Sequence, residues 1–151
     1  MEKEIVTQTI NYQKSNDFAV QPTKADAQSA GDDLYAAIPN PIDIKPGETV
    51  KITTGLKMEL PMGTFGAVFA RSGLATKKGL GLANSVGVID SSYRGEIIVA
   101  LYNHSSETQV VSPGDRIAQL VILPYICGNY IETDNLSKTE RGDGGFGHSG
   151  T

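Results

Sequence analysis

The sequence contains no tryptophan, a single cysteine and only two histidines among its 151 residues. The single cysteine, Cys127, excludes a disulfide bond within the chain, and its apolar neighbours predict that it fills part of the core. Because His104 and His148 are far apart in the sequence, a zinc site made only of protein ligands is not expected. The sequence also lacks a P-loop, a dinucleotide-binding glycine fingerprint and the CxxC and HExxH motifs.

An excess of positive charge is also absent. The chain has 13 lysines and arginines against 17 aspartates and glutamates. General binding to a nucleic-acid backbone needs a basic field, although a few local cations can hold a small polyphosphate. The N-terminal residues lack a signal-peptide pattern, and the longest apolar run, 117–127, is interrupted by Gln119 and Pro124. We therefore expect a cytoplasmic protein that binds neither nucleic acid nor a membrane.

Short β-rich runs separated by proline and glycine turns dominate the rest of the chain. One short helix is predicted over residues 74–78, ending at Gly79. Strands are expected at residues 4–10, 42–44, 48–54, 56–60, 65–70, 82–89, 97–102, 108–111, 116–123 and 130–132. Many short strands with almost no helix predict an all-β fold in one domain, either a sandwich, a jelly roll or a barrel.

The composition changes near residue 135. The last ten residues hold five glycines, and Phe146 is their only aromatic residue. Such a segment is typical of a mobile tail rather than a strand. We therefore expect residues 1–134 to form the β-domain and residues 135–151 to form a flexible C-terminal arm.

A polar turn lies between two apolar runs in the middle of the chain. Val88 and Ile89 read as the end of one strand and residues 97–102 as the next, which predicts a β-hairpin with Asp90 and Tyr93 at its tip. Aspartate and serine are common in turns because their side chains bond to nearby backbone groups, so this turn alone does not require a function.

Five short polar patches recur between the predicted strands, at residues 30–34, 71–73, 87–95, 114–120 and 141–150. Each patch by itself has an ordinary explanation as a turn, a cap or a chain end. Together and in this order they resemble the five motifs of the trimeric deoxyuridine triphosphatase (dUTPase) family. The most specific parts are Gly87-Val88-Ile89-Asp90, followed by Tyr93 and Gly95, and Arg141-Gly142 with Gly144-Gly145-Phe146-Gly147. Ala70 and Ser92 depart from the family pattern.

The resemblance implies a jelly-roll-like β-barrel that assembles as a homotrimer with active sites shared between chains. It also implies Mg²⁺-assisted hydrolysis of dUTP to dUMP and pyrophosphate. In that reaction Asp90 activates the water that attacks the α-phosphorus, as an ionised carboxylate can do. Tyr93 places its ring against the deoxyribose and leaves no room for a 2′-hydroxyl.

The same resemblance assigns the remaining contacts to substrate. The backbone of Val88 and the amide of Asn84 are expected to bond the uracil edge, a type of site that strongly rejects a base with mismatched donors. The phosphates are expected to contact Arg71, Ser72, Gly73 and Gln119, where the start of the predicted helix favours anions. Asp115 and Arg116 are expected to form structural or intersubunit contacts.

The resemblance also gives roles to the acidic first patch and to the arm. Asp33 is expected to hold a water of the Mg²⁺ shell, because Mg²⁺ keeps waters and takes few carboxylates. The arm is expected to close over bound substrate: Arg141 on the γ-phosphate, Phe146 on uracil, the backbone of Gly147 on phosphate, and a hydroxyl contact from Ser149.

Two alternatives remain. A dCTP deaminase shares the fold and part of the third motif, but it places a glutamate in the strand that follows, where this chain has Ala100. A catalytically inactive nucleotide-binding or regulatory protein is the other alternative. The presence of Asp90, Tyr93 and the complete arm motif argues against that second alternative.

Overall fold

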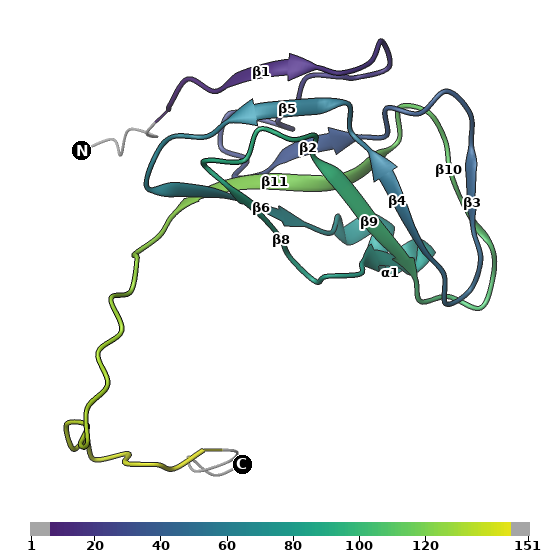
Figure 1. The fold of residues 1–151 in the computed structure, drawn as a ribbon. Coiled ribbons are helices and arrows are strands. Elements are labelled where there is room, and N and C mark those ends of the chain that lie inside the picture. The colour runs from purple at the N-terminus through teal and green to yellow at the C-terminus, as the bar shows by residue number, and fades with distance from the viewer. Residues whose placement is uncertain (1–6, 146–151) are drawn as a thin grey trace.

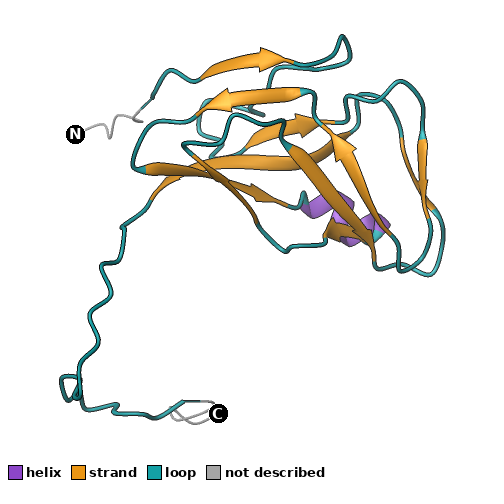
Figure 2. Ribbon diagram, in the orientation of Figure 1, coloured by secondary structure: helices purple, strands orange, loops and turns teal. Residues whose placement is uncertain are grey.

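The computed structural model describes residues 7–145, which form eleven short strands and one short helix (Figures 1 and 2). The strands are β1 (Asn11–Lys14), β2 (Asp32–Tyr35), β3 (Ile42–Ile44), β4 (Thr49–Thr53), β5 (Leu56–Glu59), β6 (Thr64–Phe69), β7 (Leu80–Leu82), β8 (Gly87–Asp90), β9 (Ile98–Asn103), β10 (Gln109–Val111) and β11 (Arg116–Pro124). The helix is α1 (Ser72–Lys78). The all-β prediction is therefore confirmed, and the helix begins two residues earlier than predicted.

The strands form antiparallel sheets whose neighbours are distant in sequence. The largest sheet has the order β2-β11-β6-β8, and a second sheet has the order β4-β9-β7. Two pairs, β1-β5 and β10-β3, complete the architecture. A chain that passes repeatedly from one sheet to another is typical of a jelly-roll-like fold.

The core is made of aliphatic side chains that alternate along the strands. On β9 the inward positions are Val99, Leu101 and the fully buried Asn103. The Asn103 amide is satisfied because it donates to the carbonyl oxygens of Ile44 at 2.8 Å and Glu107 at 2.7 Å. A buried amide with its partners present costs little and fixes the loop after β9.

A β-bulge in β11 decides which residues reach the surface of the largest sheet. The register between β11 and β2 shifts between Arg116 and Ala118, and both Ile117 and Ala118 are buried. The extra residue of a bulge redirects the side chains that follow it. Beyond the bulge Gln119 is partly exposed, between the buried Ala118 and Leu120.

The helix ends at a glycine for a conformational reason. Gly79 has φ 65° and its N–H donates to the carbonyl of Leu74, a left-handed cap that glycine adopts without steric cost. Lys77 and Lys78 lie in the last turn, where positive charge is favourable.

The predicted hairpin between residues 88 and 102 is wrong. Strand β8 pairs with β6, whereas β9 pairs with β4 and β7, so the turn after Asp90 connects two different sheets. The cause is Ile97, which is buried and whose backbone bonds to Thr54 and Leu56 at 3.2 and 2.8 Å. The predicted strand at 82–89 is likewise divided by a turn in which Ser85 has φ 61°.

Three other predictions at the chain ends differ from the structure. Residues 7–10 of the predicted first strand are irregular, and the rest of that strand lies outside the described residues. The strand predicted at 130–132 is wrong, because no described residue after Pro124 belongs to a strand. Cys127 is exposed instead of filling the core, since the chain leaves the β-domain before reaching it (Figure 1). The boundary at residue 134 stays a prediction.

Within residues 7–145, no helix has the length and apolar character needed to cross a membrane.

Candidate active site

Three of the five polar patches meet at one end of the largest sheet. Gln119 of β11 lies opposite Asp33 on β2 and opposite Phe69 on β6. Arg71 follows β6 by two residues and precedes α1. Strand pairing therefore brings together Asp33, Arg71 and Gln119, although Asp33 and Gln119 are 86 positions apart in the sequence.

Asp33 is the electrostatic centre of this group. Its Oδ1 forms an ion pair with Arg71 Nε at 2.7 Å, and its Oδ2 lies 3.3 Å from Arg116 Nη1. The Asp33 side chain is 15% exposed, whereas the Arg116 side chain is 53% exposed. The group thus carries two guanidinium charges against one carboxylate. Such a balance suits an anion with several phosphate oxygens.

These residues line a pocket of about 360 Å³. Its wall includes Asp33, Arg71, Ser72, Gly73, Arg116 and Gln119. Arg116, which was expected to make structural or intersubunit contacts, pairs with Asp33 and also lines this pocket. Its place within the fourth patch, residues 114–120, is the sequence signal for its position in the pocket wall. Asp115, by contrast, does act structurally, accepting a hydrogen bond from the backbone N–H of Ser112 at 2.8 Å.

The side chain of Gln119 is held in a tight space. Its Nε2 donates to the carbonyl oxygen of Ala70 at 2.9 Å. On the other side, a Cβ added to Gly31 would lie only 2.7 Å from Gln119 Oε1. The glycine of the first patch is therefore needed for the observed position of Gln119.

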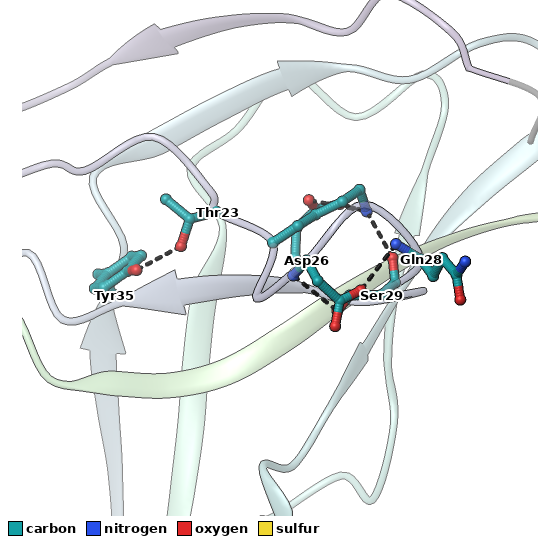
Figure 3. Close-up of polar contacts among 7 residues, drawn as sticks. Thr23, Asp26, Gln28, Ser29 and Tyr35 are labelled. Atoms are coloured by element: carbon teal, nitrogen blue, oxygen red, sulfur yellow. Dashed lines mark hydrogen bonds and ion pairs between the residues drawn. The ribbon is translucent and has the colours of Figure 1, made fainter.

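Ser29, which lines this pocket, belongs to a turn at residues 26–29 (Figure 3). The Asp26 carboxylate accepts from the backbone N–H of Gln28 at 2.8 Å, and the Asp26 N–H donates to Ser29 Oγ at 3.2 Å. The Gln28 contact, together with a smaller contribution from Ser29, lowers the pKa of Asp26 from 3.8. Close by, the hydroxyls of Thr23 and Tyr35 are hydrogen-bonded at 2.6 Å, and Thr23 O accepts from the N–H of Asp33 at 2.7 Å.

A second pocket of about 250 Å³ lies around the end of β8. Val88, Asp90, Tyr93, Glu96 and Ile98 contribute to its wall. Asp90 is exposed, and its backbone carbonyl accepts from the N–H of Tyr93 at 3.0 Å, which closes a turn. Within residues 7–145, no hydrogen bond or ion pair engages the Asp90 carboxylate, so it faces the pocket with both oxygens available for water.

The two pockets lie at opposite ends of strand β6. Asp90 pairs with Phe65 at the start of β6, whereas Arg71 follows the end of the same strand. At about 3.3 Å per residue, the six positions from 65 to 71 separate these ends by about 20 Å. A single copy of the chain therefore does not bring Asp90 and Arg71 together.

A family model described as dUTPase matches residues 17–150. The chain belongs to the dUTPase family. Its relatives include a protein of Desulfitobacterium hafniense strain Y51 named deoxyuridine 5′-triphosphate nucleotidohydrolase, 53% identical over 142 residues that cover 93% of this chain and 94% of that protein. A protein of the same name from Syntrophotalea carbinolica is 42% identical over 144 residues, covering 95% and 98% of the two chains. The resemblance seen in the sequence is thereby confirmed.

Solved dUTPase structures have the same fold. The Staphylococcus bacteriophage 80alpha dUTPase with bound dUpNHpp has a TM-score of 0.84 at 26% identity, covering 96% of this chain and 100% of that chain. A point mutant of the dUTPase from phage phi11 of S. aureus has a TM-score of 0.79 at 22% identity, covering 87% of this chain and 100% of the other. Its description refers to coordination of a structural Mg(II) ion.

The other residues implied by the dUTPase motifs are distributed as follows. Asn84 lies in the turn before β8, with Nδ2 3.7 Å from the place of a Cβ at Gly87, and it is not among the residues that line either pocket. Arg141 is exposed, and its Nε donates to Gly144 O at 2.8 Å. It belongs to the segment after Pro124, which runs away from the β-domain (Figure 1). Phe146, Gly147 and Ser149 lie outside the described residues.

The Mg²⁺ expected for a dUTPase needs oxygen ligands from the protein or the substrate. Residues 7–145 contain no cluster of three or more histidine, cysteine, aspartate or glutamate residues that could hold a metal ion. Asp33 is a single carboxylate on the wall of the first pocket. Mg²⁺ commonly uses one or two carboxylates and the phosphates of its substrate, so this donor set fits a metal that arrives with a nucleotide.

Proposed function

We propose that this chain hydrolyses dUTP to dUMP and pyrophosphate. Family membership and the names of its relatives support this activity. The single observation that carries the proposal is the convergence of Asp33 of β2, Arg71 after β6 and Gln119 of β11 on a pocket whose charged side chains are two arginines and one aspartate. This pocket suits the triphosphate, with Ser72 and Gly73 adding hydrogen-bond donors.

The hydrolytic step in this proposal begins at Asp90. Its exposed carboxylate accepts a proton from a water molecule, which forms a new P–O bond to the α-phosphorus. The bond between the α-phosphorus and the oxygen bridging to the β-phosphorus then breaks, and pyrophosphate leaves with that oxygen. Arg71 and the amide of Gln119 stabilise the charge on the α-phosphate as it develops. No covalent enzyme intermediate is required.

Recognition of the base and sugar is assigned to the second pocket. Strand β8 pairs only with β6 among the described strands, so the backbone N–H and C=O groups at its other edge are available to a uracil. Val88, which is 63% exposed, lies on this edge strand, and Asn84 is near its start. The ring of Tyr93 packs against the deoxyribose and excludes a 2′-hydroxyl.

We propose further that the active enzyme is a homotrimer with sites shared between chains. The separation of Asp90 from Arg71 along β6 supports shared sites, because a triphosphate nucleotide must contact both. The segment after Pro124 also supports assembly, since it carries large apolar side chains that are more than three-quarters exposed: Ile126, Tyr130, Ile131 and Leu136. Several large exposed apolar side chains on one short segment are typical of a surface that another chain covers.

The arm and the metal complete the proposal. Arg141 pairs with the γ-phosphate, Phe146 stacks on uracil, and Gly147 and Ser149 contribute backbone and hydroxyl contacts as the arm closes. Asp33 holds Mg²⁺ through a water molecule; when bound, the metal offsets phosphate charge and polarises the reacting phosphorus. An exposed, unpaired Cys127 is in keeping with a cytoplasmic enzyme.

The activity is tested by measuring pyrophosphate release from dUTP, dTTP, dCTP and UTP, with and without Mg²⁺. We expect rapid release from dUTP alone, and loss of that release in Asp90→Asn. Equal release from dUTP and UTP would contradict the role of Tyr93. Tight dUTP binding without any release would instead favour the inactive binding protein.

A further inference from the structure

Glu96 connects the substrate-binding turn to two other parts of the β-domain. Its carboxylate accepts hydrogen bonds from the hydroxyl of Ser15, just after β1, and from the hydroxyl of Thr53, the last residue of β4. Glu96 directly precedes the buried Ile97, whose backbone is bonded to the β4–β5 connection. Three segments that are distant in sequence therefore meet at one carboxylate.

The neighbouring bonds fix the direction of these contacts. Thr53 Oγ1 accepts the backbone N–H of Gly55 at 3.0 Å, which leaves its proton free for Glu96. The N–H of Ser15 donates to Gly55 O at 2.8 Å, so both hydroxyls are held beside the same connection. The hydrogen bond from Ser15, then that from Thr53, lowers the pKa of Glu96 from 4.5 despite the opposing effect of desolvation. The carboxylate is thus an ionised acceptor at neutral pH.

The same residue holds Tyr93 through its backbone. Tyr93 Oη donates to the carbonyl oxygen of Glu96 at 2.9 Å. The Tyr93 ring lies so close to Gly95 that a Cβ at that position would overlap the hydroxyl. The position of the ring is therefore set by the backbone of residues 95 and 96. The hydrogen bonds of the Glu96 side chain to Ser15 and Thr53 hold that backbone in place.

We propose that Glu96 is a positioning residue: by anchoring residues 90–96 to Ser15 and Thr53, it fixes the Tyr93 ring and so sets how strictly the site excludes a ribonucleotide. This inference rests on the proposed hydrolysis of dUTP. Glu96 acts here through Tyr93, and its carboxylate takes no part in the chemical step. Loosening the anchor should therefore relax selection at the sugar more than it slows hydrolysis of dUTP.

The test compares Thr53→Val with Thr49→Val. Thr53→Val removes one donor to Glu96, together with the acceptor of the Gly55 N–H, without altering the pocket wall. Thr49 is an exposed residue of the same strand and serves as the matched control. We expect Thr53→Val to lower the ratio of kcat/KM for dUTP to kcat/KM for UTP about tenfold, the effect of losing one hydrogen bond to a charged group. The kcat for dUTP should stay within about twofold of the parent value, since the reacting groups are untouched.

Glu96→Gln and Glu96→Ala extend the series. Glutamine keeps one acceptor oxygen and should give a selectivity between those of the parent and Glu96→Ala. If Thr53→Val and Glu96→Gln both keep the parent ratio while the parent enzyme is selective for dUTP, the anchoring role of Glu96 is wrong and the proposed function stands. If the parent enzyme releases no pyrophosphate from dUTP, the proposed function is what fails.

A second measurement does not depend on activity. Hydrogen exchange of the free enzyme, followed by mass spectrometry, should become at least about threefold faster in residues 90–97 of Thr53→Val, because local opening is opposed by fewer bonds. Thr49→Val should leave this segment unchanged. Equal exchange in the parent and Thr53→Val would overturn the inference whatever the kinetics.

Discussion

Replacing Gly31 with alanine should impair dUTP hydrolysis through a neighbour rather than by direct contact with substrate. The added Cβ would lie 2.7 Å from Gln119 Oε1 and 3.4 Å from Gln119 Cβ. Gly31 does not have a positive φ, so its backbone accepts alanine and the side chain of Gln119 must move instead. The movement breaks the 2.9 Å hydrogen bond from Gln119 to the carbonyl of Ala70.

The expected effects on stability and activity differ greatly in size. Losing one partly buried hydrogen bond lowers the free energy of unfolding by about 1 kcal/mol. Alanine also lowers the conformational entropy of the unfolded chain, which offsets about 0.5 kcal/mol of that loss. The net loss of about 0.5 kcal/mol lowers Tm by only about 1–2 °C in a chain of this size. A displacement of about 1 Å at a group that orients the reaction can lower kcat/KM about 100-fold.

Pyrophosphate release and thermal unfolding of the Gly31→Ala variant measure the two effects together. The double variant Gly31→Ala/Gln119→Ala supplies the control, because the clash with Oε1 is absent when residue 119 is alanine. In that background Gly31→Ala should change kcat/KM no more than about twofold. Parent-like activity of Gly31→Ala, or its full effect in the Gln119→Ala background, would refute the reasoning.

Three further outcomes are expected. Asp90→Asn should lower kcat for dUTP about 10²–10⁴-fold with nearly unchanged substrate binding, measured by pyrophosphate release and calorimetry; an active variant would remove the proposed base. Gly95→Ala should displace the Tyr93 ring and raise UTP turnover relative to dUTP, unless the ring has no role at the sugar. The hydrogen bonds accepted by the Glu96 carboxylate lower its pKa from 4.5, with a smaller effect from Lys57. Its stabilising effect is therefore present above pH 4.5 and is lost as the pH falls through the lowered pKa. Urea unfolding of Glu96→Gln should depend less steeply on pH in this acidic range.

The sequence predicted the fold class and most strands because local signals and global fold agree along β6, β9 and β11. Alternating apolar residues and proline or glycine turns were enough there. The turn after Asp90 misled the prediction because strand partners are not encoded locally: Ile97 bonds to the β4–β5 connection rather than to β8.

The candidate site was predictable as a set of motifs but not as a geometry. Gln119 reaches the pocket only because of the bulge after Arg116, and no local sequence pattern indicates that bulge. The pairing of Arg116 with Asp33 likewise depends on two strands distant in sequence. Cys127 was assigned to the core from its apolar neighbours, but those neighbours belong to a segment that leaves the β-domain and so stay exposed.

A subunit-mixing experiment tests the shared active site most directly. Arg71→Ala and Asp90→Asn, each inactive alone, are unfolded, combined in equal amounts and refolded, and dUTP hydrolysis is measured. If one chain supplies Arg71 and its neighbour supplies Asp90, about a quarter of the sites in random trimers combine both intact residues, and activity should return to that level. If both residues came from the same chain, no mixed site would be intact and activity would stay absent.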